Sequence, residues 1–262
     1  MIVAALLSTA CGDAGELPEV GPQDERWQPV IAQHSQGEIS RRDPIRVVFT
    51  RDVADEIQVG SSASEAISVR PQIRGSVTFT STSEIMVVPD GDLEPGSAYV
   101  VTLHASGLHR VPPELDQYRF VVRVMEQGFD VDVAGLEPDP AGDGTLVLSG
   151  RLMTADIDDP ASVERMVSAR LEGRDVPITW NHDFAGRGHD FSIGGIARAE
   201  SEATLSLSWT GEPIGVPSTG TREVTVPAVG VFAVTRVVAV QGDRQYVLVQ
   251  FSDPLDPSQN LD

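Results

Sequence analysis

The chain has 262 residues, of which 39 are Asp or Glu and 19 are Lys or Arg, so its formal net charge is −20. Such an excess of negative charge repels phosphate backbones, and nucleic-acid binding is therefore not expected. The length suggests about two domains, and the single cysteine excludes a disulfide framework and a zinc site built from several cysteines.

The first notable stretch is LLSTACG, which contains that single cysteine, Cys11. Ile2–Leu7 is apolar but far too short to span a bilayer, and three small residues separate it from Cys11. Small residues before a cleavage point are typical of signal-peptide processing. With a cysteine directly behind them, the stretch resembles a bacterial lipoprotein signal, which implies that Cys11 is lipidated and that residues 1–11 are the signal remnant. The alternative is an ordinary buried cysteine near the N-terminus.

Residues 12–33 are rich in Gly, Pro and acidic residues and show no sustained period. This composition is typical of a flexible tether. Stable anchoring takes more than one acyl chain, which a lipidated Cys11 would supply, and the tether would then hold the folded part off the bilayer. The expected location is the cell envelope, with a lipid anchor facing the periplasm. The outer membrane is favoured over the inner one because Gly12, rather than Asp, follows Cys11.

Residues 34–126 alternate between apolar and polar in several short segments, as half-buried strands do. The segments are Ile45–Phe49, Val77–Phe79, Ile85–Val87, Tyr99–Leu103 and Phe120–Val124. Turn residues such as Pro89-Asp90-Gly91 lie between them. Short strands without intervening long helices predict one antiparallel β-sandwich of immunoglobulin size.

Residues 127–229 repeat this pattern and predict a second sandwich. The alternating segments are Phe129–Val133, Leu146–Leu148, Val176–Trp180, Phe191–Ile193 and Leu205–Trp209. One short helix is expected between two of its strands. Asp159 is its predicted N-cap and Pro160 its first residue, with Val163, Met166 and Val167 on one face.

Residues 230–262 contain two more strand-like segments, Val231–Val240 and Tyr246–Phe251. Two strands alone cannot bury an apolar face, so this region is expected to be the incomplete start of a third sandwich, and the chain a fragment of something longer. If the chain were complete, these two strands would have to extend the second sandwich. The predicted fold class is all-β, with tandem Ig-like antiparallel β-sandwiches, one short helix in the second, and a third left unfinished.

Two stretches could hold a metal ion. Trp180–Asp190 carries His182, His189 and two aspartates, and imidazole and carboxylate suit several divalent ions. Its alternation and glycines fit a plain β-hairpin better, with the turn at Gly186–Gly188. The acidic residues Asp156, Asp158 and Asp159 suggest calcium, but the glycine and closing Glu of an EF-hand loop are absent, and helix capping explains Asp159.

Nothing in the sequence predicts catalysis. No Gly-x-Ser-x-Gly segment is present, and His34, His104 and His109 belong to no partner pattern. The glycines do not form a phosphate-binding loop. We therefore expect no enzyme activity, no catalytic residues, no cofactor and no bound metal.

Five phrases in order along the chain resemble bacterial alpha-2-macroglobulin lipoproteins. They are GEISRRDPIRVVFTRDVADEIQVG from Gly37, VRPQIRG from Val69, LEPGSAY from Leu93, LSWTGEPIGV from Leu207 and QFSDPLD from Gln250. The resemblance covers residues 34 to 262 and implies macroglobulin-like domains.

That resemblance implies a protease inhibitor, in which a protease cuts a bait segment and is then caged by a rearrangement of the molecule. Many members carry a thioester made from a Cys and a Gln, but this chain has no cysteine after Cys11 and so has no thioester. It would be the non-catalytic N-terminal scaffold. Its partners would be the bilayer, through Cys11, and proteases, through a downstream part. The alternative is an Ig-like cell-envelope lipoprotein that binds a protein or glycan ligand.

Overall fold

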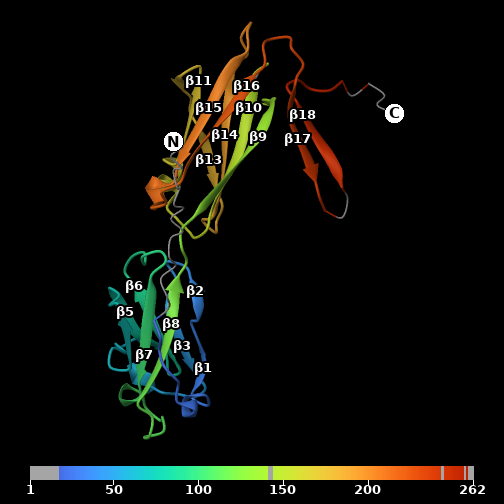
Figure 1. Ribbon diagram of the computed structural model, residues 1–262. Helices are drawn as coiled ribbons and strands as arrows, with labels where there is room; N and C mark the ends of the chain where they lie inside the picture. Colours follow the sequence, from blue (N-terminus) through green and yellow to red (C-terminus); the bar gives the residue numbers. More distant parts are fainter. Residues whose placement is uncertain (1–17, 141–143, 243–244, 257, 259–262) are drawn as a thin grey trace, which may run out of the picture. The chain divides into compact units, whose positions relative to one another are not determined.

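The structure is a computed structural model that describes residues 18–140, 144–242, 245–256 and 258 (Figure 1). The chain divides into two compact units between Glu126 and Gln127, the position at which the sequence places the boundary between the first two sandwiches. Cys11 lies outside the described residues. In the described part of the chain, no helix is long and apolar enough to cross a bilayer.

The first unit consists of two four-stranded sheets, with the orders β1-β3-β6-β5 and β2-β8-β7-β4. The bounds in the first sheet are β1 Ile31–His34, β3 Ile45–Phe49, β5 Gly75–Ser81 and β6 Glu84–Pro89. In the second they are β2 Gly37–Ile39, β4 Ile67–Arg70, β7 Ala98–His104 and β8 Gln117–Val124. Short 3-10 helices lie at η1 Glu25–Trp27, η2 Glu56–Gln58 and η3 Ala105–Gly107.

One strand pair in the first unit differs from the purely antiparallel arrangement expected from the sequence. Strands β2 and β8 run parallel, whereas the other neighbouring strands of the unit are antiparallel. The chain leaves β1 in one sheet and enters β2 in the other after only two residues. Because the chain enters the second sheet through this switch and not through a hairpin, β2 runs parallel to β8. Gly37 stands at the switch with a φ of +70°, a conformation that glycine adopts at little cost.

The alternating apolar residues of the first unit form its core. In β3, Ile45, Val47 and Phe49 are buried and Arg46 is exposed. Strands β6, β7 and β8 show the same alternation. Full burial of such a side chain stabilises the fold by about 1.5–3 kcal/mol, so the inward faces of the two sheets hold one another. All five strands predicted for this region are confirmed.

The folded part begins earlier than the sequence predicts. Residues 12–33 are expected to be a tether, but Glu25–Trp27 forms η1 and Ile31–His34 forms β1. Trp27 is fully buried, with its ring centroid 5.9 Å from that of Tyr118. Trp27 and Val30, at 0% and 1% exposure, supply the burial that anchors this stretch, and two isolated apolar residues create no sustained period in the sequence. The prediction of a tether up to residue 33 is therefore wrong for these elements.

The second unit also has two four-stranded sheets, with the orders β13-β14-β10-β9 and β12-β11-β15-β16, and all their strand pairs are antiparallel. The bounds in the first sheet are β9 Phe129–Pro138, β10 Leu146–Thr154, β13 Thr179–His182 and β14 Gly188–Ile196. In the second they are β11 Val167–Leu171, β12 Arg174–Asp175, β15 Ala203–Thr210 and β16 Thr219–Val226. A 3-10 helix, η4 Glu212–Ile214, follows β15.

The predicted short helix is confirmed as α1, Pro160–Glu164, which joins β10 in one sheet to β11 in the other. Val163 is buried within α1. Met166 and Val167, predicted on the same helical face, lie beyond the helix because it ends at Glu164: Met166 is buried in the following turn, and Val167 begins β11. Asp159 occupies the N-cap position, but its carbonyl rather than its side chain accepts the first helical bonds, from the amides of Ser162 and Val163 at 2.9 and 3.1 Å.

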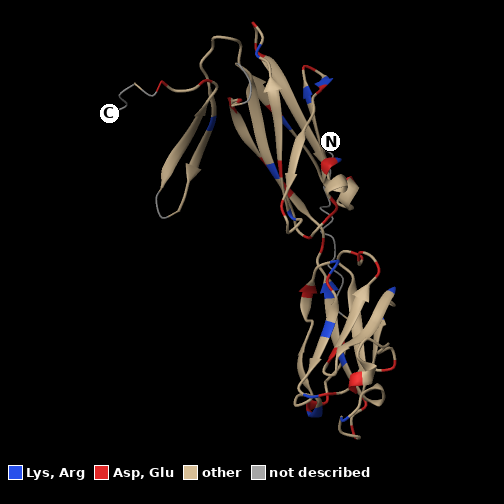
Figure 2. Cartoon of the chain, turned by 180° about the vertical axis from the view of Figure 1, so that it is seen from behind, with Lys and Arg blue, Asp and Glu red and all other residues tan. Residues whose placement is uncertain are grey.

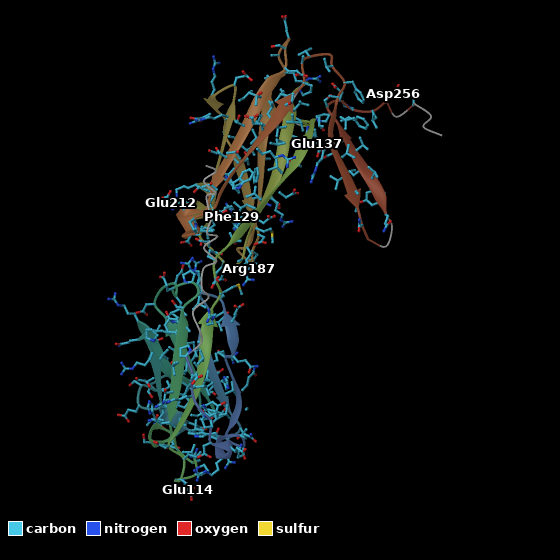
Figure 3. All side chains as sticks on the ribbon, in the orientation of Figure 1. Glu114, Phe129, Glu137, Arg187, Glu212 and Asp256 are labelled. Carbon is cyan, nitrogen blue, oxygen red and sulfur yellow. The ribbon has the colours of Figure 1, made fainter. Side chains whose placement is uncertain are left out.

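The last two predicted strands are confirmed as β17, Val234–Val240, and β18, Tyr246–Phe251, which pair only with each other. The hairpin packs beside β9 within the second unit. The Thr235 hydroxyl donates to the carbonyl of Leu136 at 2.6 Å, and the Gln250 carboxamide donates to the carboxylate of Glu137, which is labelled in Figure 3.

Each unit is thus a pair of face-packed sheets of about 100 residues, and the fold is a tandem Ig-like β-sandwich. The sequence missed six of its strands, namely β1, β2, β4, β11, β12 and β16. Most of these are short or lie at a sheet edge, where one exposed face and few apolar residues leave little alternation to detect.

Candidate functional site

The sequence-predicted sites fall in two places. Cys11, the expected lipidation site, lies outside the described residues. The histidine and aspartate stretch forms the hairpin of β13 and β14, whose turn spans residues 183–187. The predicted hairpin is therefore confirmed, with different bounds: β13 begins at Thr179 rather than Val176, and Gly188, predicted in the turn, is the first residue of β14. The hairpin brings two histidines together.

His182 and His189 are direct partners across β13 and β14. Their Nδ1 atoms are 2.8 Å apart, and Nε2 of His182 lies 3.2 Å from a carboxylate oxygen of Glu164, the last residue of α1. The ring of Trp180 stacks on His182, with centroids 5.9 Å apart and planes inclined by 5°. The pair thus connects the hairpin to the helix that bridges the two sheets.

The protons of this pair follow from its partners. An ionised carboxylate only accepts, so His182 carries a proton on Nε2 facing Glu164. One further proton lies between the two Nδ1 atoms, donated by whichever ring carries it. At 2.8 Å there is no room for a proton on both Nδ1 atoms, so the two rings cannot both be charged in this arrangement.

His189 is the buried member of the pair, with 0% of its surface exposed. Its Nε2 has no hydrogen-bond partner among the residues that the structure describes. Burial is the main cause that holds the pKa of His189 below its usual range, and His182 acts in the same direction. The carboxylates of Asp183, Asp158 and Asp190 act in the opposite direction without reversing the shift.

We expect acid to destabilise the second unit through His189. The pKa of His189 is lower in the folded chain than in the unfolded chain. Just below about pH 6.5, the unfolded chain therefore binds a proton at this histidine that the folded chain does not bind. The free energy of unfolding therefore decreases as the pH is lowered through this range, by at most about 1.4 kcal/mol per pH unit. Urea unfolding at a series of pH values, followed by the indole N–H signals of Trp180 and Trp209, measures the effect.

The matched variant is His189→Gln, which cannot take up a proton. We expect its unfolding free energy to depend less on pH below about 6.5 than that of the parent chain. An equal pH dependence in the two proteins would mean that another group is responsible.

The arrangement suits a proton better than a metal ion. Glu164 lies at the far ring nitrogen of His182, while His189 lies at the near one, so the three side chains do not converge on one point. Among residues 18–140, 144–242, 245–256 and 258, no group of three or more His, Cys, Asp or Glu side chains could hold a metal ion.

The acidic cluster is largely engaged in local hydrogen bonds. Asp156 and Asp158 are buried, and a carboxylate oxygen of each accepts the backbone amide of the following residue at 2.8 Å. Gln127, which the sequence analysis did not single out, donates to Asp158 at 3.0 Å and accepts the amide of Asp156 at 3.0 Å. The hydrogen bonds among these three residues hold the loop in place, which agrees better with a structural role than with a calcium site.

The three histidines without a predicted partner each have one. His34 Nε2 lies 3.2 Å from the Tyr118 hydroxyl, and His104 Nε2 lies 2.9 Å from the Ser68 hydroxyl. His109 lies 3.3 Å from the carboxylate of Asp55. These partners come from distant parts of the sequence, which is why no local spacing reveals them.

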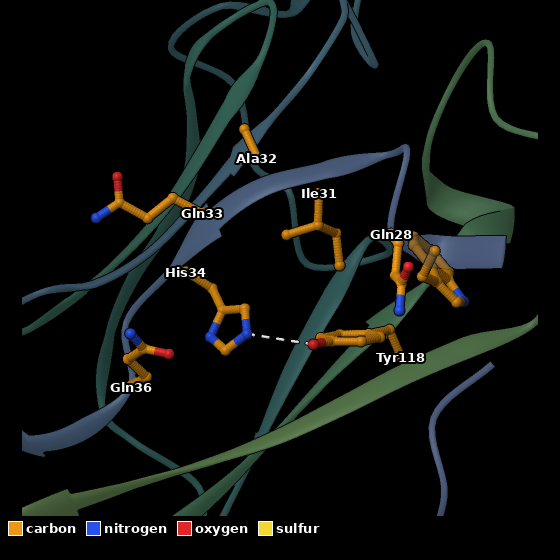
Figure 4. Close-up of a pocket in the computed structure, with 8 residues that line it drawn as sticks. Gln28, Ile31, Ala32, Gln33, His34, Gln36 and Tyr118 are labelled. Atoms are coloured by element: carbon orange, nitrogen blue, oxygen red, sulfur yellow. Dashed lines mark hydrogen bonds between the residues drawn. The ribbon is translucent and has the colours of Figure 1, made fainter. Parts of the chain in front are cut away.

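A hollow of about 320 Å³ lies in the first unit, between η1, β1 and β8 (Figure 4). Eight residues line it: Trp27, Gln28, Ile31, Ala32, Gln33, His34, Gln36 and Tyr118. The His34 and Tyr118 rings, joined by their hydrogen bond, stand in its wall. Burial raises the pKa of Tyr118, so its hydroxyl stays protonated over the physiological range. Sequence reasoning did not predict this hollow because most of its lining lies in residues 12–33, the expected tether.

Comparison with known proteins assigns no family. No family model matches the chain, and no curated protein matches it. Among solved structures, bovine butyrophilin matches with 10% identity and a TM-score of 0.30, over 76% of this chain and 97% of butyrophilin. The LD transpeptidase LdtMt1 in complex with imipenem matches with 16% identity and a TM-score of 0.26, over 75% of this chain and 73% of that one. Likenesses of this size carry no statement about function.

Proposed function

We propose that this chain is the non-catalytic N-terminal scaffold of a lipid-anchored bacterial alpha-2-macroglobulin that traps proteases. The observation that carries the proposal is the serial order of two Ig-like sandwiches and a further hairpin with uncovered apolar side chains. The family phrases in the sequence run in the same order. The scaffold has no chemistry of its own, and its sheets hold other parts of the molecule in position.

The β17–β18 hairpin supports the expectation of a third module. Val237 and Val247 are 62% and 63% exposed, and Tyr246 and Leu248 are also exposed. A lone hairpin is marginally stable in water and leaves such side chains in solvent. Further strands of a third sandwich would cover these faces, so the proposal assigns residues 230–262 to the start of that module.

Two family phrases coincide with positions that a sandwich needs. Pro71–Gly75 connects β4 in one sheet to β5 in the other. Leu93–Tyr99 forms the turn into β7, in which Leu93 and Tyr99 are buried and Gly96 has a φ of +73°. The residues of both phrases are therefore explained by the connections and turns of the first unit, which supports a scaffold function for them.

Protease trapping is tested with the complete product of the gene, purified from its native membrane. A caged protease keeps its activity on short peptides, which diffuse into the cage, and loses its activity on large protein substrates, which do not. We expect this split when a protease is mixed with the native protein. If the native protein leaves the activity of the protease on large protein substrates unchanged, the proposal is wrong.

Anchoring is tested by Cys11→Ser, with Ser8→Ala as the matched control. We expect the Cys11 variant to leave the membrane fraction and to lose fatty-acid labelling, because each buried methylene of an acyl chain contributes about 0.8 kcal/mol to membrane binding. The Ser8 variant keeps a small residue before the cysteine and should remain in the membrane. A Cys11 variant that remains in the membrane would contradict the lipid anchor.

A further inference from the structure

The hollow in the first unit has an uncharged lining. None of its eight lining residues is Asp, Glu, Lys or Arg, although Asp, Glu and Arg residues occur at many positions along the chain of this unit (Figure 2). No ion pair can therefore select a charged ligand there. The net charge of −20 adds a general repulsion of polyanions. The lining therefore favours a neutral ligand.

Three of the polar side chains that line the hollow are carboxamides, those of Gln28, Gln33 and Gln36. Figure 4 shows Gln28 and Gln36 toward its two ends, with His34 and Tyr118 between them. Each carboxamide offers an acceptor oxygen and two donor hydrogens. A hydroxyl group both donates and accepts, so neighbouring hydroxyls match a carboxamide on both counts. The polar lining thus favours a ligand with many hydroxyl groups.

The remaining wall is aromatic and aliphatic. Tyr118 and His34 meet edge to face with centroids 5.7 Å apart, and Ile31 lies beside them. The electron-rich face of an aromatic ring attracts C–H groups, which a sugar ring carries in addition to its hydroxyls. Trp27 also lines the hollow, and its buried Nε1–H has no hydrogen-bond partner among the described residues. Because Trp27 is 0% exposed, this donor lies behind the wall of the hollow and does not reach its space.

We propose that this hollow binds a neutral saccharide through Gln28, Gln36 and the His34–Tyr118 pair. Its volume of about 320 Å³ lies at the small end for pockets that hold small molecules, which limits the bound part to one or two sugar units. The site faces solvent, so we expect a dissociation constant of about 1 mM. Saccharide binding depends neither on the lipid anchor nor on protease trapping, so its test can fail or succeed independently of the tests of anchoring and trapping.

The test is an NMR titration of the ¹⁵N-labelled full chain with three neutral trisaccharides, those of glucose in α and β linkage and of N-acetylglucosamine. We expect at least one of them to shift the side-chain amide signals of Gln28 and Gln36 and the indole signal of Trp27. The double variant Gln28→Ala/Gln36→Ala should bind at least tenfold more weakly. Both glutamines are exposed, so the variant should fold normally, as its remaining spectrum will show.

Gln72→Ala is the matched control, because Gln72 is an exposed glutamine of the same unit that does not line this hollow. It should bind as the parent does. Co-sedimentation with starch, cellulose and chitin separates the sources of the ligand: retention assigns the site to units within a polymer, and binding of free trisaccharide alone assigns it to soluble sugar. The proposal is overturned if no trisaccharide shifts these signals, or if the double variant binds as tightly as the Gln72 variant.

Discussion

Replacing Gly75 with alanine is expected to destabilise the first unit by about 2–5 kcal/mol. Gly75 has a φ of +155°, and a Cβ placed on it would lie 2.1 Å from the carbonyl oxygen of Val88 and 2.9 Å from the Cα of Pro89. These neighbours are backbone atoms of the paired strand β6, so they cannot rotate away. A side chain at such a φ costs about 1–3 kcal/mol, and the overlap costs a similar amount.

The measurement is urea unfolding followed by the Trp27 indole signal, which reports on the first unit alone because Trp180 and Trp209 belong to the second. We expect the Trp27 transition to move to much lower urea while the other two stay in place. Gly91→Ala is the matched control. Gly91 is exposed, and nothing lies within 4 Å of an added Cβ. The explanation is wrong if both variants unfold at the same urea concentration.

Replacing Arg198 with alanine is expected to release the β17–β18 hairpin from the second unit. The Arg198 side chain is only 7% exposed, and it donates to the Asp253 carboxylate at 2.7 Å. It also donates to the carbonyls of Pro227, Ala228 and Val231, which lead into the hairpin. Asp253 is 41% exposed and can turn to water, so most of the cost comes from the carbonyls that lose a charged donor. A hydrogen bond to a charged group contributes about 1.5–3 kcal/mol.

Hydrogen exchange of the β17 and β18 backbone amides measures this release. A lone hairpin is marginally stable, so the amides should exchange far faster in Arg198→Ala than in the parent, while those of β10 and β14 should keep their protection. Arg170→Ala is the matched control, because Arg170 and Asp175 form an ion pair of the same 2.7 Å length with side chains 64% and 80% exposed. Such surface pairs contribute about 0–1 kcal/mol. Unchanged protection of the hairpin in both variants would show that other contacts hold it.

The strands that the sequence predicts best are those that lie between two neighbours and bury one face. In β3, β7 and β8 the side chains alternate between core and solvent, and the sequence alternates with them. The hairpin of β13 and β14 is also predictable from the sequence, because Gly186 in its turn lies between two segments of alternating residues. Local chemistry is sufficient for these elements.

The candidate sites were much less accessible to sequence reasoning. The spacing of His182 and His189 allowed either a metal site or a hairpin, and only the register shows that their Nδ1 atoms face each other. Gln127 makes hydrogen bonds to two aspartates that lie about 30 positions further along the chain, a separation that no local sequence pattern reveals. The hollow in the first unit depends on Trp27 and Tyr118, which are 91 positions apart.

The sequence by itself determined the class of fold, the boundary between the two units and the short helix at Pro160, because alternation, turn residues and proline act within a few residues of each other. Only the tertiary structure decided that Trp27 draws η1 and β1 into the first core, that β2 runs parallel to β8, and which side chains meet at His189 and around the hollow. The reason is physical: burial and pairing between distant segments depend on how two sheets pack, and that packing leaves no periodic trace in either segment alone.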